Sequence, residues 1–223
     1  MRLKDVLKTV DNNYQVGVNV NSIANKIKQE IKRIEANIIR DNKRVTITGI
    51  SERIVVELKK LAKQLKRNEQ DDTEIFATCA RNLFELNLTL KFILMSDANL
   101  NKWMSQRVSD EIDIIEGIQK LSYTKDAADY IELSNRIDTL REICKKHGVE
   151  LGRHLTVKKL AEEVGNIEEY ESFFKLYSKY IHPTSWLVHS QFEDVHSFEY
   201  RNIFIIRSQL YGGDSLGRLQ EVK

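Results

Sequence analysis

The chain has 223 residues, of which 41% are hydrophobic and 30% charged, a composition that is ordinary for a globular protein and argues against a disordered one. The net charge of +2 is unevenly distributed, because residues 1–70 carry 16 Lys and Arg against 8 Asp and Glu, whereas residues 71–223 carry 19 against 25. The basic segment indicates either an anionic partner, such as RNA or a nucleotide, or docking on the acidic remainder of its own chain or of a second copy.

The start of the chain contains no apolar run of signal-peptide length, and the longest apolar stretch, LFELNLTLKFILM, is interrupted by Glu85, Asn87 and Lys91. We therefore expect a cytoplasmic protein that does not span a membrane. The two cysteines, Cys79 and Cys144, have no C-x-x-C partner, which argues against a zinc ribbon, a redox motif or a disulfide framework and predicts two buried thiols.

The chain has a single proline and 9 glycines, so helix is favoured nearly everywhere and an all-α helical bundle is expected. In residues 21–42 the isoleucines recur on one face, which predicts an amphipathic helix capped by Asn21 or Ser22. Residues 51–67 repeat the spacing, so the two helices are expected to form a basic hairpin or a homodimer through these helices. Between them, VTITG alternates by twos without a second strand to pair with, and we expect a connector there.

Residues 72–96 carry apolar side chains almost all round the helix, as a buried central helix does. From Tyr211 onward the sequence, which contains GGDSLGRLQEVK, predicts a mobile tail. The expected organisation is a basic helical region over residues 1–70, a helical core over 71–210 and a flexible tail over 211–223. Further helices are expected from Asp97 to about Leu121, from Asp126 to His147, from a Thr156 cap to Gly165, before His182, and near residues 198–210.

The central helix carries a polar stripe formed by Thr78, Arg81, Glu85 and Thr89, which are spaced three, four and four residues apart. An arginine and a carboxylate removed from water need a partner, because their burial is otherwise costly. The stripe therefore indicates either an architectural ion pair between Arg81 and Glu85 or a polar pocket.

The stretch SKYIHPTSW contains the only proline, Pro183, directly after His182, and Ser178 lies one helical turn before the histidine. Because a residue before proline avoids helical geometry, we expect His182 to end its helix and Pro183 to make a corner. The histidine is then either a simple helix cap or a member of a site with Arg81, Glu85 and Ser178.

These residues resemble an uncharacterised bacterial helical family of unknown function, marked by Arg-x-x-x-Glu on a core helix and Ser-x-x-x-His-Pro about a hundred residues later. The resemblance covers roughly residues 71–190. More distantly, the architecture is similar to HEPN domains, many of which cleave RNA without a metal through an Arg-x4-6-His motif. Arg81 and His182 are not on one helix as that motif requires, and the one literal match, Arg141 with His147, looks accidental because it lies at a helix end.

The histidines do not predict a metal site. His182, His189 and His196 recur every seven residues, which on a straight helix separates them by about 10 Å. Glu193 and His196 form a Glu-x-x-His, but the chain has no second such motif for a di-metal site. We expect no metal and no cofactor.

Two functions remain as hypotheses. The first is a HEPN-like ribonuclease or RNA-binding domain of the toxin or phage-defence type, in which His182 moves a proton, Arg81 holds phosphate, and Glu85 and Ser178 orient them. The second is a non-catalytic helical interaction module in which the polar cluster is structural.

Overall fold

The computed structural model describes residues 13–36, 41–67, 73–121, 128–147, 151 and 155–222. The described residues form helices joined by short turns, and none of them lies in a strand, so the predicted all-α fold is confirmed. The helices gather into two compact units, one within Met1–Phe92 and Leu160–Lys223 and the other within Ile93–Lys159. Over the same described ranges, no helix combines the length and apolarity needed to cross a membrane.

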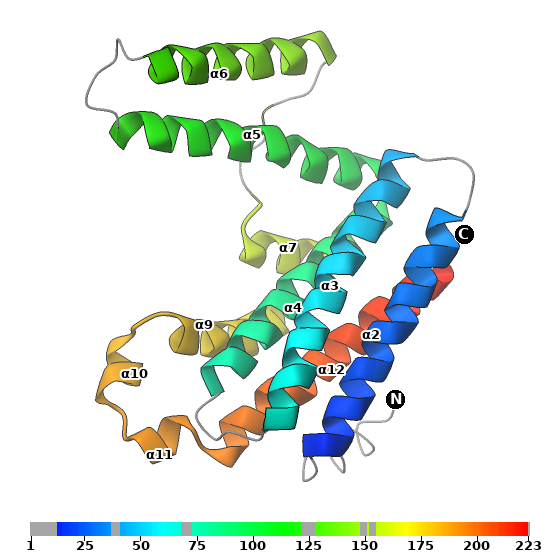
Figure 1. The fold of residues 1–223 in the computed structure, drawn as a ribbon, viewed down its shortest axis with the longest axis vertical. Helices are drawn as coiled ribbons and strands as arrows, with labels where there is room; N and C mark the ends of the chain where they lie inside the picture. The colour runs from blue at the N-terminus through cyan, green and yellow to red at the C-terminus, as the bar shows by residue number, and fades with distance from the viewer. Residues whose placement is uncertain are drawn as a thin grey trace. The chain divides into compact units, whose positions relative to one another are not determined.

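The first unit carries every predicted site residue, and its helices are shown in Figure 1. A few residues of α4 and α7 extend past its bounds. In chain order its elements are α2 (Asn13–Glu35), α3 (Asn42–Arg67), α4 (Thr73–Met95), α7 (Val157–Glu163), α8 (Ile167–Glu169), the π-helix η2 (Tyr170–Phe174), α9 (Lys175–Ile181), α10 (Ser185–His189), α11 (Phe192–Val195) and α12 (Phe198–Glu221).

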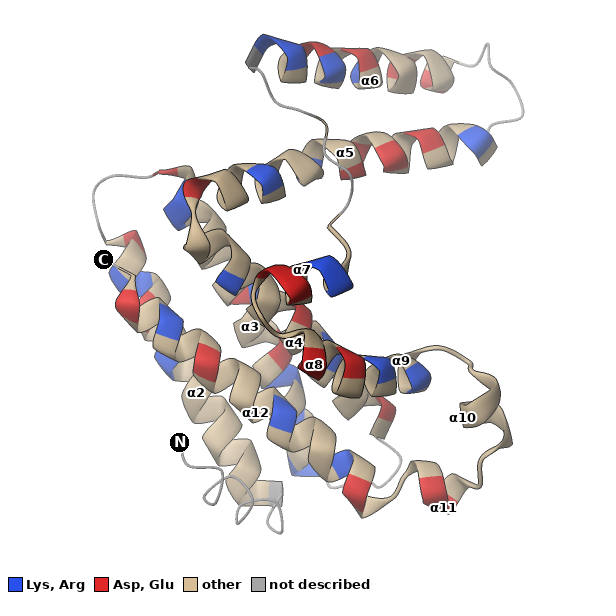
Figure 2. Ribbon diagram, turned by 180° about the vertical axis from the view of Figure 1, so that it is seen from behind, with Lys and Arg blue, Asp and Glu red and all other residues tan. Residues whose placement is uncertain are grey.

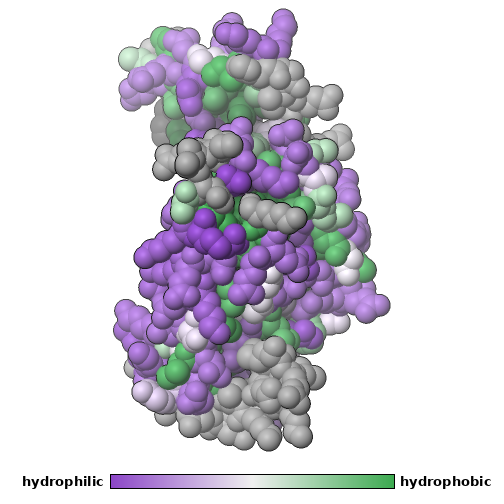
Figure 3. Space-filling model, turned by 90° about the vertical axis from the view of Figure 1, so that its right-hand side faces the viewer, coloured by the Kyte–Doolittle hydropathy of each residue, from purple (hydrophilic) through white to green (hydrophobic). Residues whose placement is uncertain are grey.

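The hairpin predicted for the basic N-terminal region is present, because α2 and α3 pack along each other and α12 packs against both (Figure 1). The apolar stripes of α2 and α3, which suggested a homodimer, therefore pack against other helices of this unit. Figure 3 shows one side of the molecule, on which hydrophilic side chains predominate. The buried stripe of α2 consists of Val16, Val20, Ala24, Ile27, Ile31 and Ile34.

Two expectations about the ends of these helices are wrong. The stretch VTITG is not a connector but lies inside α3, where Ile47 and Ile50 are buried. Burial of these side chains against the neighbouring helices overrides the weak local preference of β-branched residues for strand. Asn21 and Ser22 are not caps either, because α2 begins eight residues earlier, at Asn13.

The mobile tail expected from Tyr211 is also not what the structure shows, because α12 continues to Glu221. Tyr211, Ser215 and Leu219 are buried, so this stretch belongs to the core of the first unit. Its glycines have a packing role: a Cβ atom at Gly212 would lie 3.0 Å from Cδ2 of Leu58. The short side chain lets α12 approach the α2–α3 hairpin closely.

The neighbouring glycine provides a matched test of this packing. A Cβ atom at Gly213 meets no other atom within 4 Å, so Gly213→Ala should stabilise the helix by about 0.5–1 kcal/mol. Gly212→Val should destabilise the protein by about 1–3 kcal/mol, because Leu58 and Ile23 must move. Urea unfolding of both variants measures the difference. Unchanged stability in both would mean that this stretch is not folded as α12.

The central helix predicted over residues 72–96 is α4, and its apolar residues are buried on most faces of the helix. Phe84 lies in the middle of α4, with the ring centroid of Phe174 at 5.8 Å and that of Tyr211 at 5.3 Å. The central helix is therefore held between the η2–α9 segment and α12. This arrangement positions the polar residues described below.

The second unit is a helical pair formed by α5 (Asp97–Leu121) and α6 (Ala128–His147), which agrees with the predicted helices. Ion pairs flank its small core: Nη2 of Arg136 lies 2.7 Å from Glu111, and Nη2 of Arg141 lies 3.1 Å from Glu116. The core residues are Ile112, Ile115, Ile137 and Leu140.

Candidate active site

The corner at Pro183 is built as its sequence predicts. His182 caps α9 in an extended conformation, with φ −107° and ψ 146°. A residue before proline adopts this conformation because the proline ring clashes with a helical backbone at that position. The N–H of His182 still donates to the carbonyl of Ser178 at 3.3 Å, and the N–H of Thr184 donates to the carbonyl of His182 at 2.7 Å. The chain turns tightly, and His182 is exposed at the end of α9.

A π-helical turn, η2, precedes the corner. Such turns contain one residue more than an α-helical turn and occur frequently at functional sites. The extra residue rotates every later side chain by about 100°, which sets the face on which Ser178 and His182 lie. Phe174 in η2 is buried against Phe84, so this face is fixed relative to the central helix.

Arg81 links the central helix to the corner. Its Nε donates to Oε1 of Glu85 at 2.9 Å, and its Nη1 lies 3.4 Å from Nε2 of His182, 101 residues later in the chain. Its guanidinium carbon lies 4.9 Å from the centroid of the Phe174 ring, a cation–π contact. The structure therefore brings three of the four predicted site residues into one line of polar contacts.

The contact between Arg81 and His182 has a defined donor. A guanidinium can only donate, so a hydrogen bond across this contact uses the lone pair of Nε2 of His182 as its acceptor. The side chains of Arg81 and Glu85 are 23% and 35% exposed, so a ligand can reach them. A neutral imidazole nitrogen beside a fixed positive charge can act as a general base next to an anion.

The hydroxyl groups expected at this site bind their own helices instead. Each donates to the backbone carbonyl four residues earlier: Thr78 at 2.8 Å, Thr89 at 2.9 Å and Ser178 at 3.0 Å. This bond is a common alternative for Ser and Thr inside helices. Ser178 therefore lies on the helix that carries His182, but its hydroxyl is engaged by the backbone of that helix.

A shallow groove between α3 and α4 adjoins the carboxylate of Glu85 and has a volume of about 300 Å³. The exposed cation Arg53 lies on its α3 side. The groove extends the site from the corner toward the basic hairpin. Its lining consists of Arg53, Val56, Glu57, Asn82, Glu85, Leu86 and Thr89.

The outer side of the α2–α3 hairpin is basic. Lys28 of α2 lies close to Lys59 of α3, and the proximity and positive charge of Lys28 lower the pKa of Lys59. Two like charges held together favour a bound anion, which relieves their repulsion. The exposed cations of α3 are Arg53, Lys59, Lys60, Lys63, Lys66 and Arg67.

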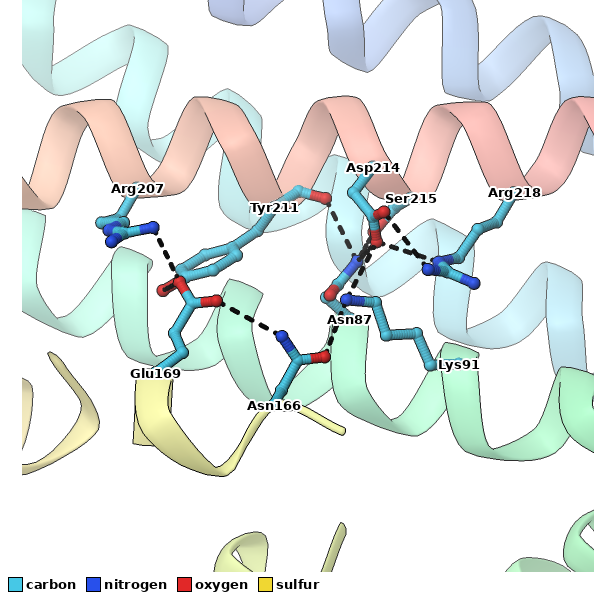
Figure 4. A network of polar contacts seen from close by, with 9 residues as sticks. All are labelled: Asn87, Lys91, Asn166, Glu169, Arg207, Tyr211, Asp214, Ser215 and Arg218. Atoms are coloured by element: carbon cyan, nitrogen blue, oxygen red, sulfur yellow. Dashed lines mark hydrogen bonds and ion pairs between the residues drawn. The ribbon is translucent and has the colours of Figure 1, made fainter. Parts of the chain in front are cut away.

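A second polar network, which the sequence analysis did not predict, joins α4, the turn before α8, and α12 (Figure 4). The side chain of Asn87 donates to Oδ2 of Asp214 at 2.7 Å and to Oγ of Ser215 at 3.0 Å. Nζ of Lys91 lies 3.4 Å from the same carboxylate oxygen and donates to Oδ1 of Asn166 at 3.0 Å. Three segments that are distant in the sequence are thereby tied together.

The network continues to two buried tyrosines. The hydroxyls of Tyr177 and Tyr211 are 2.9 Å apart, and that of Tyr211 donates to Oε1 of Glu169 at 2.8 Å. The same oxygen accepts from Nη1 of Arg207 at 3.0 Å. Burial raises the pKa of both tyrosines, so both remain protonated and act as fixed donors. This arrangement is typical of a structural clamp rather than of a reactive centre.

Asp214 is held in its charged form. Burial would raise its pKa, but hydrogen bonds from Arg218 and Asn87 and the charge of Lys91 outweigh burial and hold the pKa below its usual range. The charged carboxylate therefore stabilises the folded state above the usual pKa range of an aspartate, and this contribution is lost as the pH falls through the lowered pKa.

Cys79 and Cys144 are buried free thiols, as predicted. Burial and the charge of Glu57 raise the pKa of Cys79 to about 12, so its thiol does not ionise near neutral pH and is a poor nucleophile. Within the described part of the chain, no group of three or more His, Cys, Asp or Glu side chains is placed to hold a metal ion.

A model of DUF5677, a family of unknown function, matches residues 65–197, which is more than half of the chain. The matched range includes Arg81, Glu85, Ser178 and His182, and it confirms the resemblance found on these residues. Neither the curated proteins nor the solved structures contain a match to the chain.

Proposed function

We propose that this chain, which belongs to DUF5677, binds RNA and cleaves it without a metal ion at the corner formed by Arg81 and His182. The observation that carries the proposal is the 3.4 Å approach of Nη1 of Arg81 to Nε2 of His182 at an exposed helix end. Because the two residues come from different helices, the proposal depends on their geometry and not on the HEPN motif.

The proposed reaction is a transesterification. The 2′-hydroxyl of a ribose attacks the adjacent phosphorus, the bond from phosphorus to the 5′-oxygen breaks, and a 2′,3′-cyclic phosphate and a 5′-hydroxyl form. When RNA binds, Nη1 of Arg81 exchanges Nε2 of His182 for a phosphate oxygen, the freed Nε2 accepts the proton of the attacking hydroxyl, and water supplies the proton of the leaving oxygen. Arg81 donates to the phosphate oxygens, where negative charge increases in the transition state. Glu85 acts as a positioning residue because it binds Nε of Arg81.

The exposed cations of α3 support an RNA partner. This helix presents exposed Lys and Arg residues beside the groove that adjoins Glu85. Cations along a surface bind the phosphate backbone and release its counterions, so the affinity should fall steeply with salt. In this proposal the exposed cations of α3 bind the RNA backbone, and the Arg81–His182 corner cleaves it.

His182→Ala should reduce the rate of RNA cleavage by about 10²–10⁴-fold, because it removes the general base. Arg81→Lys should reduce the rate by about 10²-fold, because lysine cannot donate two parallel hydrogen bonds to phosphate. The measurement is degradation of labelled single-stranded RNAs of varied sequence in EDTA, with unfolding curves of each variant recorded alongside.

His189→Ala is the matched control, because His189 is an exposed histidine on α10 and should leave the rate within about twofold of the wild type. A substrate with 2′-deoxyribose at the cleavage position should remain intact, because it has no nucleophile. Cleavage that survives His182→Ala, or no cleavage by the wild type on any RNA, would contradict the proposal.

A non-catalytic interaction module is the second candidate, and one observation favours it. Arg81, Glu85 and Ser178 each already have a partner inside the chain. If the cluster is structural, His182→Ala lowers the melting temperature and RNA remains intact with either protein. The two measurements above therefore separate the candidates.

A further inference from the structure

A second groove lies among α10, α11 and the start of α12 and has a volume of about 590 Å³. We name it the aromatic–acidic groove. It shares no lining residue with the corner or with the α3–α4 groove. Its lining consists of Trp186, Ser190, Asp194, Ser197, Glu199, Tyr200 and Ile203.

Two aromatic rings form one wall of this groove. The ring centroids of Trp186 and Tyr200 are 6.0 Å apart, and the ring planes meet at 81°. Nearly perpendicular rings form a corner of π surface, and the negative faces of such rings attract cations. Trp186 is 36% exposed, so a ligand can reach this surface.

A third aromatic residue, Tyr180, packs against both rings of this wall and holds them in place. Tyr180 is 3% exposed, and its ring lies 5.4 Å from Trp186 and 5.9 Å from Tyr200. Its hydroxyl donates to the carbonyl of Val195 at 2.7 Å, which ties α9 to the end of α11. A wall fixed in this way needs little ordering when a ligand binds.

Two carboxylates complete the lining. Asp194 of α11 and Glu199 of α12 are exposed, and in Figure 2 acidic residues mark both α11 and the first turn of α12. Within the ranges that the structure describes, neither carboxylate forms an ion pair with Lys or Arg. The negative charge of the groove is therefore not neutralised by those parts of the chain.

We infer that the aromatic–acidic groove binds an organic cation of the amine or guanidinium class. Carboxylates repel phosphate, so this groove is not an extension of the proposed RNA surface. A π surface beside carboxylates suits an alkylammonium or guanidinium group, which combines positive charge with apolar or planar surface. The inference does not depend on the proposed function, because it uses none of the same residues.

Binding can be followed through Trp186 itself. The chain has two tryptophans, so Trp103→Phe leaves Trp186 as the only reporter. Two probes are added separately at physiological salt, up to about 10 mM: spermidine, and a short arginine-rich peptide without aromatic residues. Both carry the cation, and they distinguish a free polyamine from a basic segment of a protein. Saturable changes in Trp186 emission are expected with at least one probe, and calorimetry confirms the stoichiometry.

The double variant Asp194→Asn and Glu199→Gln should raise the dissociation constant at least about tenfold. Glu193→Gln is the matched control, because Glu193 is an exposed neighbour on α11 that does not line the groove, and it should change the constant less than about twofold. The carboxylates could instead only stabilise the first turns of α11 and α12, in which case the double variant lowers the melting temperature and binding is unchanged.

Unchanged binding by the double variant would overturn the inference. Equal weakening by Glu193→Gln would also overturn it, because the attraction would then be a diffuse property of the surface. Absence of saturable binding with both probes would overturn it as well. Binding of one probe alone supports the inference and identifies the source of the cation.

Discussion

A chain that ends at Leu210 should lose cooperative unfolding or fall below the stability needed to fold at 25 °C. The deletion removes Tyr211 and Leu219, which are 4% and 0% exposed, and burial of each contributes roughly 1.5–3 kcal/mol. It also removes the hydrogen bonds that Tyr211 makes with Tyr177 and Glu169, which contribute about 1 kcal/mol each. Together these losses approach the total stability of a typical domain, about 5–15 kcal/mol.

The matched control is a chain that ends at Leu219. It keeps the carbonyl of Leu219, which accepts from Nη2 of Arg33 of α2 at 2.7 Å, and removes only the last four residues. This shorter deletion should change the melting temperature little, because Gln220 and Glu221 are exposed. Circular dichroism and urea unfolding measure both chains. If the chain that ends at Leu210 unfolds at the urea midpoint of the wild type, residues 211–219 do not pack against the core as part of α12.

The same segment shows where sequence reasoning fails in this chain. Local composition at Gly212, Gly213 and Gly217 favours a tail, because glycine is a poor helix former. Contacts with residues distant in the sequence offset this low helix propensity, since Gly212 packs against Leu58 and Ile23. The position of VTITG inside α3 has the same origin. Neither contact can be inferred from a single sequence without knowing which helices are neighbours.

The central helix and the corner were predictable because their signals are local. Apolar residues on most faces of α4 predict burial directly, and the geometry before Pro183 follows from the proline ring. The spacing of Arg81 and Glu85 predicts their ion pair. The approach of His182 to Arg81 required the family resemblance, because no local pattern relates residues that are 101 positions apart.

The network around Asp214 was missed although its signal is visible. Asn87 and Lys91 interrupt an apolar run on α4 and lie four residues apart, so they share one face of a buried helix. Their partners, Asp214 and Ser215, lie in the segment expected to be a tail. Because residues 211–223 were expected to form a tail, the partners of Asn87 and Lys91 could not be predicted.

Asn87→Asp should destabilise the protein by roughly 3 kcal/mol at neutral pH, because it places a second carboxylate against Asp214 and removes the donor from a buried position. Nδ2 of Asn87 now donates to Oδ2 of Asp214 at 2.7 Å, and Asn87 is 2% exposed, so the two charges would be close together. Repulsion between like charges favours protonation of one carboxylate of the pair.

The pH dependence of this cost has a definite sign. Wild-type Asp214 has a lowered pKa, so its stabilising contribution is present above the usual aspartate range and is lost as the pH falls through the lowered pKa. In Asn87→Asp, repulsion raises the pKa of one carboxylate of the pair, so its protonation relieves the variant at a pH where wild-type Asp214 is still charged. The difference in unfolding free energy between the two proteins should therefore shrink from pH 7 toward pH 4. A difference that stays constant with pH would mean that Asp214 does not face position 87.

The rescue of Asn87→Asp by Asp214→Asn tests the pairing directly. The double variant exchanges the amide and the carboxylate, so a donor again faces an acceptor and Lys91 retains a negative partner nearby. It should recover roughly 1–2 kcal/mol relative to Asn87→Asp alone, although Asp214→Asn by itself removes a charge that Arg218 and Lys91 stabilise. Additive losses in the double variant would show that the two side chains do not interact. Recovery would establish that α12 is joined to the central helix through the polar contact between Asn87 and Asp214.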